Sequence, residues 1–82
     1  MEELKEALKN KKAIIGTDRT LKNLKMNKVK KVYIASNCDE DVKDDIKHYC
    51  KLYSIPLIEL KENNEELGIV CKKPFAISVL SI

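Results

Sequence analysis

The 82-residue chain has no tryptophan, one phenylalanine, one histidine and only two glycines. Two glycines are too few for a glycine-rich phosphate loop or a dinucleotide-binding fingerprint. The chain has no run of about 18 apolar residues, so no membrane span is expected. The N-terminal residues lack the basic start and apolar core of a signal peptide. The usual sequence signals of nucleotide-dependent enzymes, membrane proteins and secreted proteins are therefore missing.

Metal-ligating side chains are also few. The cysteines are Cys38, Cys50 and Cys71, and the single histidine is His48. No Cys-x-x-Cys pair occurs, and no spacing fits a zinc or calcium site. Widely spaced cysteines with apolar neighbours predict buried, reduced thiols, with an oxidation-sensitive or metal-binding role as the alternative. We expect no metal site and no cofactor.

Acidic residues cluster at positions 39–45, where a catalytic pair of carboxylates is conceivable. Residues four apart in this run share a helix face, but lysines flank them. A solvated helix surface explains such a run better than a general acid–base pair. The one histidine lies beside the apolar stripe of the same helix, so no nucleophile and base pair is evident. We expect a protein that is not an enzyme.

Local sequence patterns alternate between helix and strand along the chain. Apolar spacing predicts helices over 2–9, 17–26, 39–53 and 63–70, and strands over 12–15, 29–36, 56–60 and 75–82. Predicted N-caps are Thr17, Asp39 and either Asn63 or Asn64, and Asn27 suits a left-handed position after a helix. The order αβαβαβαβ implies helices layered on a four-stranded sheet, parallel or mixed, in one domain spanning residues 1–82.

Charge is unevenly distributed around a net +3. Residues 1–36 carry ten Lys and Arg against four Asp and Glu, or +6. Residues 37–82 carry six against nine, or −3. The asymmetry is consistent with a basic footprint for a polyanion, and equally with chance variation on a solvated surface.

The segment 12–22 carries the clearest binding signal. A short apolar run stops at Gly16, a helix begins at Thr17, and Arg19 and Lys22 lie in or beside its first turn. Backbone N–H groups and positive charge then point to one spot, which favours a phosphate. Arginine can fork to phosphate or to a guanine edge, whereas lysine acts as a point charge.

A second loop, Lys72 to Phe75, offers two lysines and the only phenylalanine. No pair of exposed aromatic residues lies on a predicted strand, so base stacking of the RRM kind is not expected. Gly16 and Gly68 both fall at predicted element boundaries. Each is either an ordinary turn glycine or a place where backbone approaches a ligand closely.

Three stretches of sequence, taken in order, resemble one family. They are Ile15-Gly16-Thr17 with Arg19-Thr20 and Lys22; Ile34-Ala35-Ser36-Asn37-Cys38 with Asp45-Ile46, Tyr49 and Ile55-Pro56; and Glu66-Leu67-Gly68 with Cys71, Lys73, Phe75, Ser78-Val79-Leu80 and Ile82. Their order and spacing over nearly the whole chain resemble the L7Ae superfamily of kink-turn RNA-binding proteins, in its L30e ribosomal form.

The resemblance implies a three-layer α/β/α sandwich with a mixed four-stranded sheet. It implies a cytoplasmic protein of the large ribosomal subunit that binds a kink-turn or kink-turn-like loop of ribosomal RNA. It implies no membrane partner, and a monomer is the default for the free chain. The residues that the resemblance places at the RNA are Gly16, Thr17, Asp18, Arg19, Lys22, Asn37, Val70, Lys72, Lys73 and Phe75.

Within that set, residues 16–22 match the family's first RNA-contacting turn, and Asn37 matches an asparagine at the end of the central strand. Residues 70–75 match the loop that covers a flipped bulge nucleotide. Relatives usually carry lysine or asparagine at the position of Asp18, and L30e-type relatives carry glycine at the position of Lys72. Two alternatives stay open: a stand-alone kink-turn binder outside the ribosome, and a protein–protein adaptor on the same scaffold.

Overall fold

Four helices and four strands alternate in the computed structural model, which describes residues 2–10 and 12–82. The elements are α1 (Glu2–Lys9), β1 (Ile14–Ile15), α2 (Thr17–Lys25), β2 (Val32–Ile34), α3 (Glu40–Leu52), β3 (Leu57–Glu59), α4 (Asn64–Val70) and β4 (Val79–Ser81). The predicted order αβαβαβαβ is confirmed. Within the described residues, no helix has the length and apolar character needed to cross a membrane.

The strands form one mixed sheet in the order β1-β4-β2-β3. β4 runs antiparallel to both β1 and β2, whereas β2 and β3 are parallel. Tyr33 at the centre of the sheet pairs with Leu80 on one side and Ile58 on the other. Because β4 lies next to β1, the segment that leads into β4 is brought beside the start of α2, 60 residues earlier in the chain.

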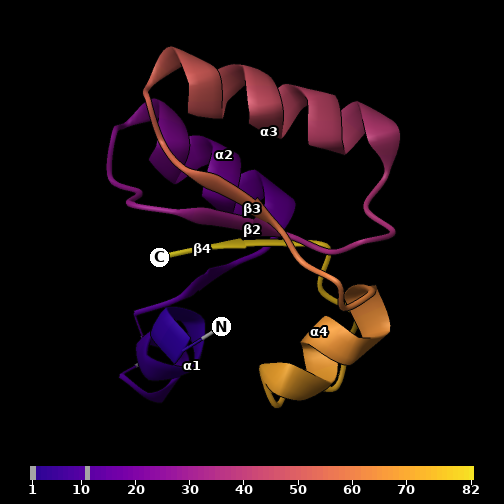
Figure 1. Cartoon of the computed structure of the whole chain (residues 1–82). Coiled ribbons are helices and arrows are strands. Elements are labelled where there is room, and N and C mark those ends of the chain that lie inside the picture. Colours follow the sequence, from indigo (N-terminus) through magenta and orange to yellow (C-terminus); the bar gives the residue numbers. More distant parts are fainter. Residues whose placement is uncertain (1, 11) are drawn as a thin grey trace.

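Helices cover both faces of the sheet, α2 and α3 one face and α1 and α4 the other (Figure 1). On the first face, Leu24 of α2 and Ile46 of α3 are fully buried with β2 and β4 residues. On the other, Leu4 of α1 and Leu67 of α4 are fully buried around Tyr33. Burying one such side chain contributes roughly 1.5–3 kcal/mol. The predicted three-layer α/β/α sandwich is confirmed.

Short-range signals in the sequence are also confirmed. The Asp39 side chain accepts a hydrogen bond from the Asp41 N–H at 3.0 Å and caps α3. Asn63 and Glu66 form a reciprocal capping box at the start of α4. Asn27 has φ +56° after α2.

The three cysteines are free and buried. Burial is the main cause that raises the pKa of the thiols of Cys38, Cys50 and Cys71. Deprotonation to the reactive thiolate is therefore disfavoured at neutral pH. The prediction of buried thiols is confirmed.

Three details of the sequence prediction are wrong. Thr17 does not cap α2: Gly16 occupies the N-cap position and Thr17 is the first helical residue. Gly68 lies inside α4 and not at a boundary. The strands are shorter than the predicted runs, because the flanking residues make single hydrogen bonds outside the ladder, such as Ala35 N–H to the Ser78 carbonyl at 2.9 Å.

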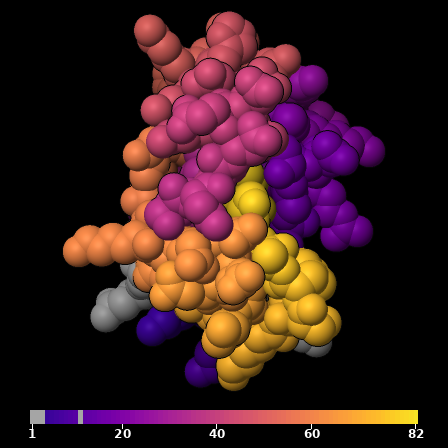
Figure 2. Space-filling view, turned by 90° about the vertical axis from the view of Figure 1, so that its right-hand side faces the viewer, coloured from indigo at the N-terminus to yellow at the C-terminus, as the bar shows by residue number. Residues whose placement is uncertain are grey.

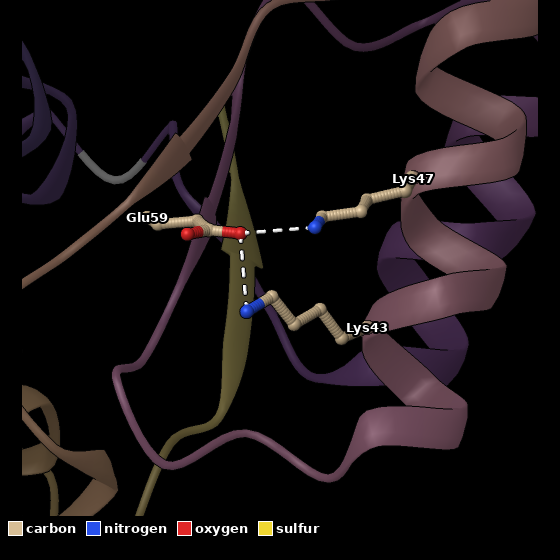
Figure 3. A network of polar contacts seen from close by, with 3 residues as sticks. All are labelled: Lys43, Lys47 and Glu59. Atoms are coloured by element: carbon tan, nitrogen blue, oxygen red, sulfur yellow. Dashed lines mark ion pairs between the residues drawn. The ribbon is translucent and has the colours of Figure 1, made fainter.

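An ion-pair network ties α3 to the edge strand β3 (Figure 3). Lys43 and Lys47, one turn apart on α3, both approach one carboxylate oxygen of Glu59, at 3.2 and 3.3 Å. Hydrogen bonds from the two lysines lower the pKa of Glu59, and the bond with Glu59 raises the pKa of Lys43. The contacts are solvent-exposed, so their net contribution to stability is small.

Candidate nucleic-acid interface

The turn that leads into α2 depends on a glycine. Gly16 has φ +114°, in the region that L side chains rarely adopt, and a Cβ added there would meet nothing within 4 Å. The backbone conformation, and not lack of space, therefore requires glycine. The Gly16 N–H donates to the Val79 carbonyl at 3.0 Å, and the Gly16 carbonyl accepts from the Thr20 N–H at 3.1 Å. These bonds hold the start of α2 against β4.

The first turn of α2 differs from those of the two helices that follow it. Side chains of Asp39 and Asn63 cap α3 and α4, and both helices carry two acidic residues in the first turn. No side chain caps α2, and its first turn carries one acidic residue, Asp18. The first backbone N–H groups of α2 therefore have no capping side chain at the positive end of the helix dipole.

The loop between α4 and β4 is held against α4 by backbone contacts. The Lys72 and Lys73 N–H groups donate to the carbonyls of Ile69 and Gly68, both at 2.9 Å. Lys72 adopts φ +57°, a left-handed conformation after the end of a helix. Gly68 allows the backbone of Phe75 to approach, because a Cβ at Gly68 would collide with the Phe75 carbonyl. The loop is thus fixed while the Phe75 side chain stays 55% exposed.

A hollow joins the two loops and brings together five of the predicted residues: Gly16, Thr17, Arg19, Lys73 and Phe75. Its remaining lining residues are Ala13, Ile15, Ala76, Ile77, Ser78 and Val79. The volume of about 690 Å³ lies within the range of small-molecule sites, so one unstacked nucleotide can be accommodated. We call this depression the α2–β4 hollow. In Figure 2, the purple start of α2 and the yellow segment before β4 lie beside each other on one face.

The other predicted residues lie around this hollow but do not line it. Lys22 lines a neighbouring depression with Arg19. Asp18 is exposed in the first turn of α2. Val70 and Lys72 line a separate groove against α1.

Asn37 is placed by a partner that the sequence did not reveal. The Asn37 side chain donates to Asn64 Oδ1 at 2.9 Å and accepts from the Asn64 backbone N–H at 2.8 Å. This double contact fixes the exposed Asn37 amide at the start of α4. Asn64 stood out in the sequence only as an alternative helix cap, because nothing local indicates a contact 27 residues away.

Ser78 and Ala76 are further lining residues that the sequence did not single out. The sequence predicts both within a strand over 75–82, whereas the ladder covers only Val79–Ser81. The Ile77 N–H instead donates to the Asn64 carbonyl at 2.9 Å, so this segment crosses the start of α4 before it enters the sheet. The bend places residues 76–78 in the wall of the hollow.

Positive charge at the hollow is free to bind an anion. Arg19, Lys22 and Lys73 are exposed. Within residues 2–10 and 12–82, no ion pair engages any of the three. Among the residues that the structure describes, no carboxylate lines the α2–β4 hollow. The site therefore combines free cations, uncapped N–H groups and one exposed aromatic ring.

The fold and this site define a class: a small three-layer α/β/α domain with a cationic, non-acidic hollow suited to an anionic ligand. The chain belongs to the Ribosomal protein L7Ae/L30e/S12e/Gadd45 family, whose profile matches residues 1–82. The predicted family is confirmed.

Curated relatives agree with this membership. The large ribosomal subunit protein eL30 of Saccharolobus solfataricus is 49% identical over 80 residues, which are 98% of this chain and 74% of the relative. The eL30 protein of Methanothermobacter thermautotrophicus is 46% identical over 69 residues, which are 84% of this chain and 70% of the relative.

Solved structures show the same fold at low sequence identity. A Bacillus halodurans protein of unknown function superposes with a TM-score of 0.88 at 22% identity, covering 96% of this chain and 78% of that protein. The Giardia lamblia 15.5kD RNA binding protein gives 0.85 at 22% identity, and this chain covers 65% of its length. At this identity the two likenesses support the fold alone.

Proposed function

We propose that this chain is a non-catalytic RNA-binding protein of the large ribosomal subunit, located on cytoplasmic ribosomes, that binds a kink-turn or kink-turn-like loop of ribosomal RNA as a monomer. The observation that carries the proposal is the α2–β4 hollow, where an uncapped helix start, free cations and an exposed aromatic ring meet. Relatives that share 38–49% identity are named as large-subunit proteins, which favours a ribosomal role over a stand-alone binder.

The proposed mechanism stabilises a bent RNA over an extended one. A kink brings two phosphate backbones close together, and their repulsion opposes bending. Arg19, Lys22 and Lys73, with the α2 N–H groups, would offset that repulsion only in the kinked state, so binding shifts the population toward it. Each phosphate contact also makes affinity fall with salt.

Two further groups give the site its shape preference. Phe75 is exposed at the rim of the hollow and can cover an unstacked base, a contact worth roughly 1–3 kcal/mol. The Asn37 amide, held by Asn64, keeps unused hydrogen-bonding capacity toward solvent, which suits a base edge in a widened groove. Both contacts need bases that are unstacked or exposed, which a regular duplex does not offer.

Fluorescence energy transfer across a labelled kink-turn tests the proposal. In magnesium-free buffer the RNA is extended, and we expect micromolar protein to raise transfer to that of the kinked form. Arg19→Ala with Lys22→Ala should weaken binding about ten- to a hundred-fold and lower the salt slope by about two. The matched control, Lys28→Ala with Lys51→Ala, removes two exposed lysines elsewhere and should have little effect.

An RNA that stays extended at micromolar protein and low salt would overturn the kink-turn proposal. Retention on large subunits after a salt wash separates a ribosomal protein from a stand-alone binder. The adaptor alternative predicts that partner binding survives the loss of Arg19 and Lys22, with no RNA folding by the parent protein.

A further inference from the structure

A second groove, away from the α2–β4 hollow, lies between α1 and the end of α4. Its lining residues are Lys5, Leu8, Lys9, Val70, Cys71 and Lys72. The rim is cationic and the floor is apolar. No Asp or Glu lines it among the residues that the structure describes. We call this surface the α1–α4 groove.

The α1–α4 groove is continuous with the α2–β4 hollow. A smaller depression between them is lined by Ala13, Ile15 and Lys73, which also line the hollow, and by Leu8 and Cys71, which also line the groove. The three depressions therefore form one track across the molecule. It starts at the first turn of α2 and ends on α1.

Charge along this track has one sign. Its charged lining residues, among those that the structure describes, are Arg19, Lys73, Lys72, Lys5 and Lys9. All five side chains are exposed, and none is in an ion pair within the described part of the chain. The depression on the other side of α1 differs, because Glu6 lines it together with Lys12, Lys28 and Lys30. Cations that make no ion pair among the described residues form a strip that attracts a polyanion.

Stabilisation of helix ends explains the positions of only some of these lysines. Lys9 lies in the last turn of α1, where a cation complements the helix dipole. Lys5 lies a full turn earlier, and Lys73 belongs to the loop beyond α4. Dipole complementation does not account for those two positions, or for the lack of carboxylates among the described residues that line the track.

We propose that the α1–α4 groove is a second RNA-binding surface, on which Lys5 and Lys9 bind the phosphate backbone of a stem that continues from the RNA bound at the α2–β4 hollow. The inference rests on the proposed function. The longest extent of the molecule is 30 Å, so a stem of about one helical turn is about as long as the protein. The new element is the role of α1 as a backbone-binding helix.

The test compares two synthetic kink-turn RNAs that share one internal loop. One carries short stems that end near the loop, and the other carries stems longer than the 30 Å extent of the protein. The variant is Lys5→Gln with Lys9→Gln. The matched control is Lys28→Gln with Lys51→Gln, which has the same charge change and, like Lys9, takes one lysine from the last turn of a helix. Urea unfolding of each protein checks that the fold is retained.

We expect Lys5→Gln with Lys9→Gln to bind the short-stem RNA like the parent protein. On the long-stem RNA it should bind roughly ten-fold more weakly near 0.1 M salt and show a salt slope lower by about two. The control pair should bind both RNAs like the parent. If the parent binds the short-stem RNA and the two double variants behave alike on the long-stem RNA, the second surface is wrong and the proposed function stands. If the parent binds neither RNA, the proposed function fails and this inference with it.

Discussion

Two cationic regions of this molecule use their side chains in opposite ways. On α3, Lys43 and Lys47 converge on Glu59 and join a helix to a sheet edge (Figure 3). At the α2–β4 hollow, Arg19 and Lys73 are exposed and have no ion pair within the described residues. Each region has two cationic side chains, so the position of a single carboxylate decides whether the charge is available for a ligand.

The comparison also shows why charge counted along the chain locates the site only in part. The count assigns +6 to residues 1–36 and −3 to residues 37–82. Arg19 comes from the basic part, but Lys72 and Lys73 come from the acidic part and reach the same track through the fold. Conversely, Lys43 and Lys47 pair with Glu59 in a contact that no local pattern indicates.

Gly68→Ala should have the largest effect. It disturbs the loop at the α2–β4 hollow and leaves the ion pairs between α3 and β3 unchanged. A Cβ at this position collides with the Phe75 backbone carbonyl, so helix and loop must separate. Overpacking costs about 1–3 kcal/mol, against a gain of about 1 kcal/mol in helix propensity. We expect a net loss of roughly 0–2 kcal/mol in the free energy of unfolding, measured in urea, together with weaker binding of kink-turn RNA.

Ile69→Ala is the control for this change, since it places the same residue type in the same helix at a side chain that is 75% exposed. It should alter stability little. Wild-type stability and RNA binding in Gly68→Ala would contradict the view that close packing of α4 fixes Lys73 and Phe75 at the hollow.

Asp18→Asn should have a smaller effect, and one of opposite sign on RNA binding. Asp18 is the only acidic residue in the first turn of α2, beside Arg19, and it is exposed. Its carboxylate interacts favourably with the positive end of the helix dipole but repels a phosphate. Removal of the charge should therefore raise RNA affinity several-fold at low salt. The accompanying loss in stability should be about 0.3–1 kcal/mol. Binding titrations in low and high salt measure the gain, which should shrink as salt increases.

Weaker binding by Asp18→Asn would show instead that the carboxylate accepts a hydrogen bond from a base, for example a guanine amino group. In that case Asp18 contributes to base recognition and does not oppose the cations beside it. Asp41→Asn serves as the control, because it removes a carboxylate from the first turn of α3.

Sequence reasoning succeeded where the cause lies within a few residues. Asp39 and Asn63 cap their helices through bonds that span two or three positions, and the apolar stripes of α2 and α3 select Leu24 and Ile46 for the core. It failed where the cause is tertiary. Gly16 replaces Thr17 at the α2 cap because the turn needs φ +114° to reach Val79.

The predicted site shows the same division. The hollow unites residues from 16–19 with residues from 73–79 because β4 inserts beside β1, and strand order is not evident from a list of helices and strands. The contact between Asn37 and Asn64, and the separation of Val70 and Lys72 into the α1–α4 groove, depend on how α4 packs. The family resemblance grouped residues 16–22 with residues 70–75, but it did not indicate which of their side chains share one depression.

Glu59→Gln should have the smallest effect, and it directly tests the ion pairs of Lys43 and Lys47 with Glu59. The two lysines lower the pKa of Glu59 below its ordinary 4.5, so the ion pair stabilises the fold above that pH. The contribution is lost as the pH falls through the lowered pKa, because the carboxyl then protonates in the folded state. We expect the parent to be slightly more stable than Glu59→Gln at pH 7, and the difference to vanish in acid. Urea unfolding at both pH values measures this difference.

Kink-turn binding by Glu59→Gln near physiological salt should be unchanged, since the freed Lys43 and Lys47 lie on α3 and do not line the hollow or the groove. A gain in RNA affinity as large as that expected for Asp18→Asn would mean that an unpaired lysine on α3 serves RNA binding as well as a cation at the α2–β4 hollow. The two cationic regions would then differ only in whether their cations are ion-paired, and their positions on the molecule would not matter.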